Sequence, residues 1–139
     1  MKKLLTILLL CTLLFSCLCA QPCFAQTGTG TIEPQYDHTQ RTRANITISA
    51  NGIATCSGYI KAIKETSLVD ITVRLMKKEG SKWTPVATWN KTNQPMTGSI
   101  EKKCSVSAGT YKVSVSGSVK PKEGKTEYVS ISSGSKTYN

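Results

Sequence analysis

Hydrophobic and polar residues alternate along residues 68–76, near the middle of the chain. The apolar positions of this segment are Val69, Ile71, Val73 and Leu75. Alternation with a period of two is typical of a β-strand that buries one face. A polar turn at residues 77–82 and a second run at residues 83–89 predict that this strand belongs to a β-hairpin.

Five further segments have strand-like patterns. They cover residues 44–50, 53–60, 99–106, 110–117 and 127–132. Asn51-Gly52 joins the first two, and this dipeptide favours a tight hairpin because both residues tolerate a positive φ. The polar residues 61–67 fit one helical turn or a loop, and residues 90–97, with Pro95, predict a loop. Seven short strands and no helix-period segment in this part of the chain predict an all-β fold, an antiparallel sandwich of two sheets.

The chain begins with a pattern typical of secretory signal peptides. Residues 1–3 are basic, residues 4–19 are almost wholly apolar, and small residues precede a cleavage site at Ala25. We therefore expect residues 1–25 to be removed and the protein to be secreted. Cleavage after Ala20, retention through an uncleaved N-terminal anchor, and lipid attachment at Cys17 are the alternatives.

The rest of the chain predicts one small domain. Residues 26–43 are rich in Thr, Gly, Gln and charged residues and lack apolar periodicity, so we expect a flexible polar leader. The β-sandwich is predicted to span residues 44–132, and residues 133–139 are expected to fray. A chain of this size is enough for one ordinary domain.

The chain is strongly basic. Loss of residues 1–25 removes Lys2 and Lys3, which lowers the formal net charge from +10 to +8. Such a charge favours polyanionic surroundings, although solubility alone also accounts for it. Eight lysines of the folded region lie mostly at predicted turns: Lys77, Lys78, Lys82, Lys102, Lys103, Lys120, Lys122 and Lys125.

Two cysteines remain in the mature chain, Cys56 and Cys104, because the other four lie in the signal region. Two cysteines in an exported domain are expected to form a disulfide. Closing a loop of about 49 residues would stabilise the fold by up to roughly 4 kcal/mol. The cysteine spacing matches no zinc motif, so we expect neither a metal nor a cofactor.

Candidate catalytic residues are few. His38 is the single histidine, and it lies in the predicted leader, so no Ser-His-carboxylate triad is expected in the folded region. A pair of carboxylates could still meet in space. The acidic residues available are Glu65, Asp70, Glu79, Glu101, Glu123 and Glu127. Most of them lie beside lysines, which indicates solvated surface, and we expect a protein that is not an enzyme.

Trp83 and Trp89 are the most suggestive pair. In a regular strand they would share one face at a separation of about 20 Å. Exposed, with Tyr59 or Tyr128 nearby, they could stack on sugar rings. Pro85 favours a bulge, which would place the two rings on opposite faces, and burial in the core is the commoner fate of large aromatics. The candidate ligand-binding residues are Trp83, Trp89, Lys77, Lys78 and Lys82.

Two resemblances extend this interpretation. Ser107-Ala108-Gly109-Thr110-Tyr111-Lys112-Val113 looks like the turn and strand of immunoglobulin-like domains, where a tyrosine two residues before a cysteine packs at a corner; Val113 stands in the cysteine position. Gly52-Ile53-Ala54-Thr55-Cys56, the Trp pair and the Gly-x-Tyr strand are similar to small uncharacterised exported proteins of Gram-positive bacteria. The resemblances imply an immunoglobulin-like sandwich outside the cell and no particular activity.

Three functions fit these observations. The leading hypothesis is a secreted, non-enzymatic binding module for an extracellular glycan or cell-wall polymer. The first alternative is a cationic, bacteriocin-like or membrane-active effector. The second is an accessory surface protein that binds another protein through an exposed sheet edge. Nucleic acid is not an expected partner, and membrane contact is expected only through the signal peptide or weak electrostatics.

Overall fold

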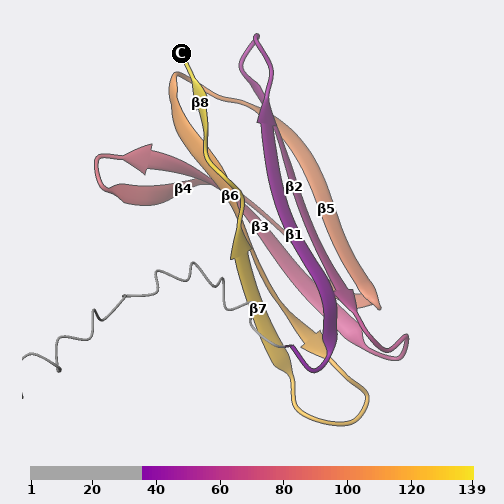
Figure 1. The fold of residues 1–139 in the computed structure, drawn as a ribbon. Coiled ribbons are helices and arrows are strands. Elements are labelled where there is room, and N and C mark those ends of the chain that lie inside the picture. The colour runs from indigo at the N-terminus through magenta and orange to yellow at the C-terminus, as the bar shows by residue number, and fades with distance from the viewer. Residues whose placement is uncertain (1–35) are drawn as a thin grey trace, which may run out of the picture. The chain divides into compact units, whose positions relative to one another are not determined.

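The computed structural model describes residues 36–139, which form eight β-strands in two antiparallel sheets (Figure 1). The strands are β1 (Thr39–Ile48), β2 (Ile53–Ala62), β3 (Leu68–Glu79), β4 (Lys82–Pro95), β5 (Thr97–Ser105), β6 (Gly109–Lys120), β7 (Glu127–Ser132) and β8 (Lys136–Tyr138). The three-stranded sheet has the order β1-β2-β5. The five-stranded sheet has the order β4-β3-β6-β7, and β8 also pairs with β6. The predicted all-β fold with two antiparallel sheets is confirmed.

The predicted signal peptide, residues 1–25, lies outside the described residues, and so do its cleavage site, Cys17 and most of the predicted leader. The part of the leader that the structure describes is not all irregular. β1 begins at Thr39, five residues earlier than the first predicted strand, because the alternation continues through Thr42 and Ala44, which are half-buried.

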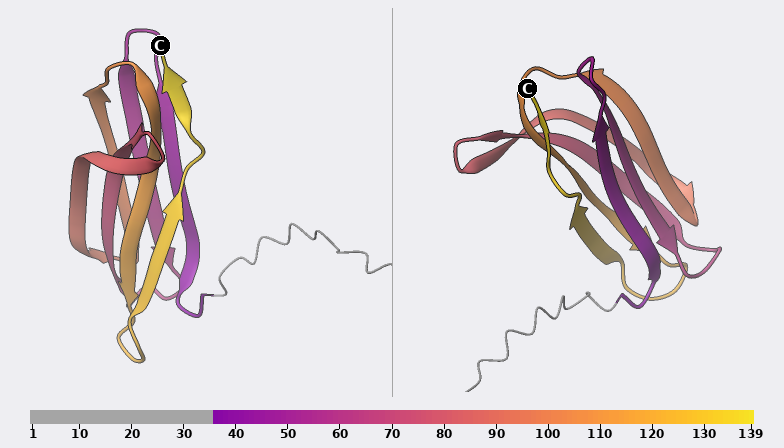
Figure 2. Two further views of the ribbon diagram at one scale, coloured as in Figure 1. Left: turned by 90° about the vertical axis from the view of Figure 1, so that its left-hand side faces the viewer. Right: turned by 45° about the horizontal axis from the view of Figure 1, so that its top comes forward.

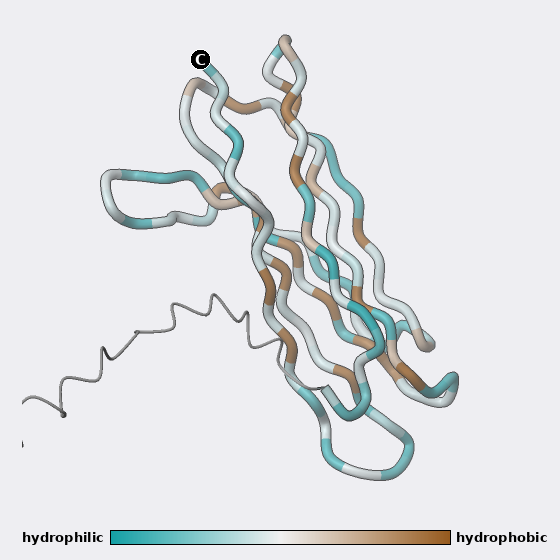
Figure 3. The backbone as a smooth tube through the Cα atoms, viewed as in Figure 1, coloured by the Kyte–Doolittle hydropathy of each residue, from teal (hydrophilic) through white to brown (hydrophobic). Residues whose placement is uncertain are grey.

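The two sheets pack face to face as a sandwich, which the three views show together (Figures 1 and 2). Hydrophobic and hydrophilic positions follow one another along the strands (Figure 3). The four apolar residues predicted to point inward from β3 are all buried: Val69, Ile71, Val73 and Leu75. The facing sheet contributes every second residue of β2, including Cys56 and Ile60. The alternating pattern therefore produces the core directly.

Gly58 and Gly98 lie where the two sheets approach each other closely. A methyl group added at Gly58 would lie 2.4 Å from Val73 Cγ2 and 2.7 Å from Val115 Cγ2. One added at Gly98 would lie 2.9 Å from Ile71 Cγ2. These distances are too short for carbon atoms, so each glycine is required for close packing rather than for backbone freedom.

Residues 133–139, which were expected to fray, contain β8. Ser133 donates its N–H to the carbonyl of Val113 (2.8 Å), and its hydroxyl accepts from the N–H of Val113 (2.9 Å). These bonds keep the chain beside β6 after β7 ends, and β8 then pairs with Gly109–Tyr111. At the end of β8 the ring of Tyr138 lies against Gly52. The C-terminal residues are thus part of the sandwich.

The corner predicted for Tyr111 is present. Its side chain is 2% exposed, and its hydroxyl donates to the carbonyl of Ser107 at 2.9 Å. A buried tyrosine bonded to the backbone a few residues upstream is the contact that defines this corner. It fixes the turn between β5 and β6.

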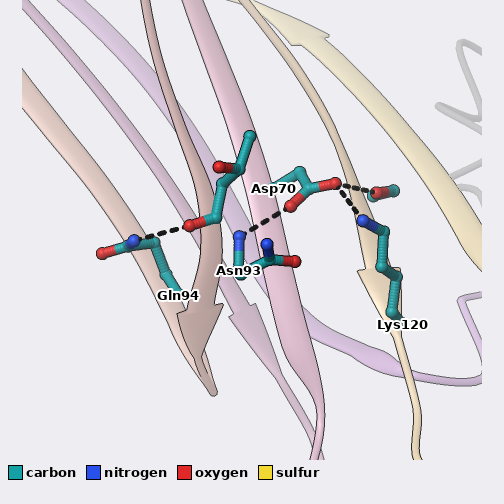
Figure 4. Close-up of polar contacts among 6 residues, drawn as sticks. Asp70, Asn93, Gln94 and Lys120 are labelled. Atoms are coloured by element: carbon teal, nitrogen blue, oxygen red, sulfur yellow. Dashed lines mark hydrogen bonds and ion pairs between the residues drawn. The ribbon is translucent and has the colours of Figure 1, made fainter.

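β4 extends to Pro95 although residues 90–97 were predicted to be a loop, because an edge strand does not need an apolar face. Its far end is held by Asp70 of β3 (Figure 4). The Asp70 carboxylate accepts from the N–H of Asn93 (2.8 Å) and the hydroxyl of Ser118 (3.3 Å), and pairs with Lys120 Nζ at 2.5 Å. The pairing register shifts at this point, and Asn93 takes a φ of 53°.

These contacts lower the pKa of Asp70. The hydrogen bond from Lys120 has the largest effect, and the bond from the backbone of Asn93 comes next. The carboxylate therefore connects the irregular end of β4 to β3 and to the neighbouring strand β6.

We expect Gly58→Ala to lower the free energy of unfolding by about 1–3 kcal/mol, because the added methyl group overpacks the space between the sheets. Gly134→Ala is the matched control, since nothing lies within 4 Å of the corresponding position. Urea denaturation of both variants provides the measurement. Equal stability of the two variants would contradict the close approach of the sheets at Gly58.

We expect Asp70→Asn to lower the free energy of unfolding by about 1 kcal/mol at neutral pH, because the pair with Lys120 is lost while a side-chain oxygen remains for Asn93. Because the folded-state pKa is below the ordinary value of 3.8, the contribution of the carboxylate is complete above that pH and is lost as the pH falls through the folded-state pKa. Denaturation curves from pH 7 to pH 2 should therefore converge for wild type and variant at the acid end. A difference in the free energy of unfolding that stays constant from pH 7 to pH 2 would contradict the role of the Asp70 carboxylate.

Candidate functional site

The two tryptophans lie on opposite faces of the five-stranded sheet. Trp89 pairs with Val73, whose side chain points into the core, whereas Trp83 pairs with Lys78 on the outer face. Between them the register shifts: Leu75 pairs with Ala87 and Met76 with Pro85, so that one residue of β4 is extra. This is the bulge that Pro85 was expected to favour.

Neither ring is an open stacking surface. Trp89 is half-buried and packs against the core. Trp83 is half-buried as well, and Lys112 Nζ lies 4.6 Å from the centre of its ring. A cation at this distance is attracted to the face of an indole and occupies one side of it.

The three candidate lysines have different surroundings. Lys77 donates to the hydroxyl of Ser107 at 3.0 Å, and its Nζ lies 5.7 Å from the centre of the Tyr111 ring. Lys78 and Lys82 are exposed near the tip of the β3–β4 hairpin. The structure therefore does not assemble the five candidate residues into one site, and their role in binding stays a prediction.

A different surface has the shape of a binding site. A hollow of about 770 Å³ is lined mainly by outward-facing residues of the three-stranded sheet and also reaches Ile131 of β7 in the other sheet. We call it the outer hollow and define it by six of its lining residues: Arg41, Arg43, Ser57, Tyr59, Ser99 and Glu101. The strands that carry them, β1, β2 and β5, run side by side in Figure 1.

Strand pairing explains the shape of the outer hollow. Arg43, Tyr59 and Ser99 form one row across the sheet, because Tyr59 pairs with Arg43 on one side and with Ser99 on the other. In the next row, Ser57 pairs with Glu101. These rows therefore place short serine side chains next to longer ones on the same face.

Arg41 and Arg43 give the outer hollow its charge. They are two residues apart on one strand, so their side chains leave the same face about 6.6 Å apart. Both are exposed. Neither guanidinium group takes part in the side-chain hydrogen bonds or the ion pair found within residues 36–139. The single acidic residue of the outer hollow is Glu101, at its opposite side.

The side chains of the outer hollow suit an anionic, hydroxyl-rich ligand. A guanidinium group binds a carboxylate or phosphate through two parallel hydrogen bonds. Tyr59 is half-buried and offers a flat ring together with a hydroxyl group. The serines add donors and acceptors that match sugar hydroxyls. The arrangement therefore supplies groups suited to binding, and Glu101 is its single carboxylate.

Sequence reasoning assigned Arg41 and Arg43 to the polar leader and did not identify them as site residues. The sequence pattern that could have identified them is a continuation of the period-two alternation of the first strand, in which Arg41, Arg43 and Asn45 alternate with Thr42 and Ala44. It is weak because Thr42 and Ala44 are small and only half-buried.

The predicted disulfide is not formed. Cys56 and Cys104 are free thiols, the first buried and the second half-buried. Cys104 pairs with Ala54, and Cys56 pairs with Lys102, so the two cysteines are diagonal neighbours on β2 and β5. Both side chains pack in the core, and the two thiols are close enough for a hydrogen bond between them. Burial, followed by the nearby Cys104, raises the pKa of Cys56 to about 12.

Two of the acidic residues, Glu127 and Glu79, make hydrogen bonds that hold the fold. Glu127 of β7 accepts from the N–H groups of Asp37 (2.7 Å) and His38 (3.3 Å) and from the hydroxyl of Thr39, which holds the start of β1. Glu79 accepts from the hydroxyl of Thr84 at 2.9 Å.

Two further features are absent from residues 36–139. This part of the chain contains no group of three or more His, Cys, Asp or Glu side chains placed to hold a metal ion. It also contains no helix long and apolar enough to span a membrane.

Comparisons of the chain with protein-family models, with curated protein sequences and with solved structures gave no match in any of the three.

Proposed function

We propose that the protein is an extracellular, non-enzymatic binding module for an anionic glycan or cell-wall polymer, which binds in the outer hollow. The observation that carries this proposal is the position of Arg41 and Arg43, two exposed guanidinium groups beside Tyr59 at the rim of a hollow. A concave surface with a few convergent polar groups is the usual form of a ligand site. The extracellular location rests on the signal-peptide pattern of residues 1–25.

The immunoglobulin-like plan is part of the same proposal. It is supported by the sheet orders β1-β2-β5 and β4-β3-β6-β7 and by the buried corner at Tyr111. Sandwiches of this plan occur in many cell-surface proteins. Because one fold serves many functions, the proposed activity depends on the outer hollow and not on the plan.

The geometry gives less support to the two alternative functions. A membrane-active effector would rest on the net charge, and the lysines responsible for it are dispersed over several turns. Recognition of a protein by strand addition needs a regular exposed edge. β4, an edge strand, has two shifts in its pairing register, and the edge strands β1 and β5 carry charged residues, including Arg43 and Lys103; both features hinder strand addition.

We expect the double variant Arg41→Gln/Arg43→Gln to bind purified Gram-positive wall polymer at least about tenfold more weakly than wild type at an ionic strength near 0.15 M, because two charge-assisted contacts are lost. Its melting temperature should be unchanged, since both side chains are exposed. Co-sedimentation with the insoluble polymer measures binding, and calorimetry measures stability.

The matched control is Lys122→Gln/Lys125→Gln, which removes the same charge from the exposed loop between β6 and β7. This control should retain nearly wild-type binding. An equal loss in both double variants would mean that net charge alone drives binding, and full binding by the arginine variant would exclude the outer hollow as the site.

A further inference from the structure

A second hollow continues the outer hollow along the same strands. It has a volume of about 500 Å³ and lies near the β1–β2 turn. We call it the turn hollow and define it by Thr47, Ser49, Thr55 and Lys103. Thr55 pairs with Thr47 on one side and with Lys103 on the other, so these three residues form one row across the three-stranded sheet.

The two hollows lie over neighbouring rows of the same face. The row of Thr55 comes directly after the row of Ser57, since the two residues are two positions apart on β2 and point the same way. From Arg41 to Ser49 the face extends for about 26 Å, taking about 3.3 Å per residue. This length exceeds that of a single phosphate or of one sugar, and its long axis is parallel to the strands.

Charge is distributed unevenly along this face. Arg41 and Arg43 lie at one end and Lys103 at the other, while Glu101 lies on β5 between them. An acidic group directly opposite Glu101 would be repelled, but a hydroxyl group could donate a hydrogen bond to it. The hydroxyl of Ser57 lies in the row of Glu101, and the hydroxyls of Thr47 and Thr55 lie in the row of Lys103.

We propose that the ligand is a linear, hydroxyl-bearing polyanion that lies along the strands and fills the outer hollow and the turn hollow at the same time. This inference rests on the proposed function of the outer hollow and adds the form of the ligand and a second contact region. Its acidic groups pair with the arginines at one end and with Lys103 at the other, and its hydroxyls face the middle. The two contact regions act as linked sites, so affinity depends on ligand length.

The test uses acidic oligosaccharides of one chemistry and two lengths. Oligogalacturonates are suitable probes because each sugar carries one carboxylate and free hydroxyls. We expect an oligomer of about eight sugars to bind wild-type protein at least about tenfold more tightly than one of about two sugars. Lys103→Gln should remove most of this advantage and leave the affinity for the short oligomer unchanged, while Lys122→Gln, the control, should change neither affinity.

The outcomes separate this inference from the proposed function. Equal affinity of wild type for both lengths, or an equal loss for both lengths in Lys103→Gln, would overturn the spanning arrangement while the outer hollow remained a binding site. Absence of binding to both oligomers and to purified wall polymer would overturn the proposed function itself, and the inference with it. Isothermal titration calorimetry with each oligomer measures these affinities, and melting curves confirm that the exposed substitutions leave the fold intact.

Discussion

Close packing of the two sheets determines which side chains this protein presents to its surroundings. Gly58 and Gly98 leave no space for even a methyl group between the sheets, and the inward residues of β3 are completely buried. A shift of register by one residue would expose these apolar side chains and bury the polar ones. The outward rows of the three-stranded sheet are therefore fixed by the core behind them. The backbone positions of Arg43 and Tyr59 are therefore set by the sheet, and sites built on strands are more precise than sites built on loops.

Much of the fold could be predicted from the sequence because most of the strands pack against a core. The alternating residues of β3 and the Asn-Gly turn after β1 identified their elements directly. The wrong predictions concern strand segments that lie at a sheet edge or consist mostly of polar residues. The end of β4 lies at a sheet edge and is held by Asp70, so residues 90–95 have no apolar pattern. β8 has only three residues and depends on the side chain of Ser133 to continue the pairing, which no periodicity reveals.

The candidate site was harder to predict because it depends on strand register. The sequence indicated correctly that Pro85 could separate Trp83 from Trp89, but not which face each ring would take. The diagonal relation of Cys56 to Cys104 follows from the pairing of β2 with β5, which joins segments about 45 residues apart. Arg41 and Arg43 became neighbours of Tyr59 and Ser99 for the same reason. None of these spatial relations can be read from the spacing of the residues along the sequence.

Backbone amide NMR of the protein lacking residues 1–25, titrated with soluble wall polymer, tests most directly whether the ligand lies on the three-stranded sheet. We expect the largest chemical-shift changes on the outward positions of β1, β2 and β5, including Arg43, Tyr59 and Thr55, and small changes along the hairpin of residues 77–83. The largest changes on that hairpin, or small changes spread over all lysine-rich turns, would contradict a binding face on the three-stranded sheet.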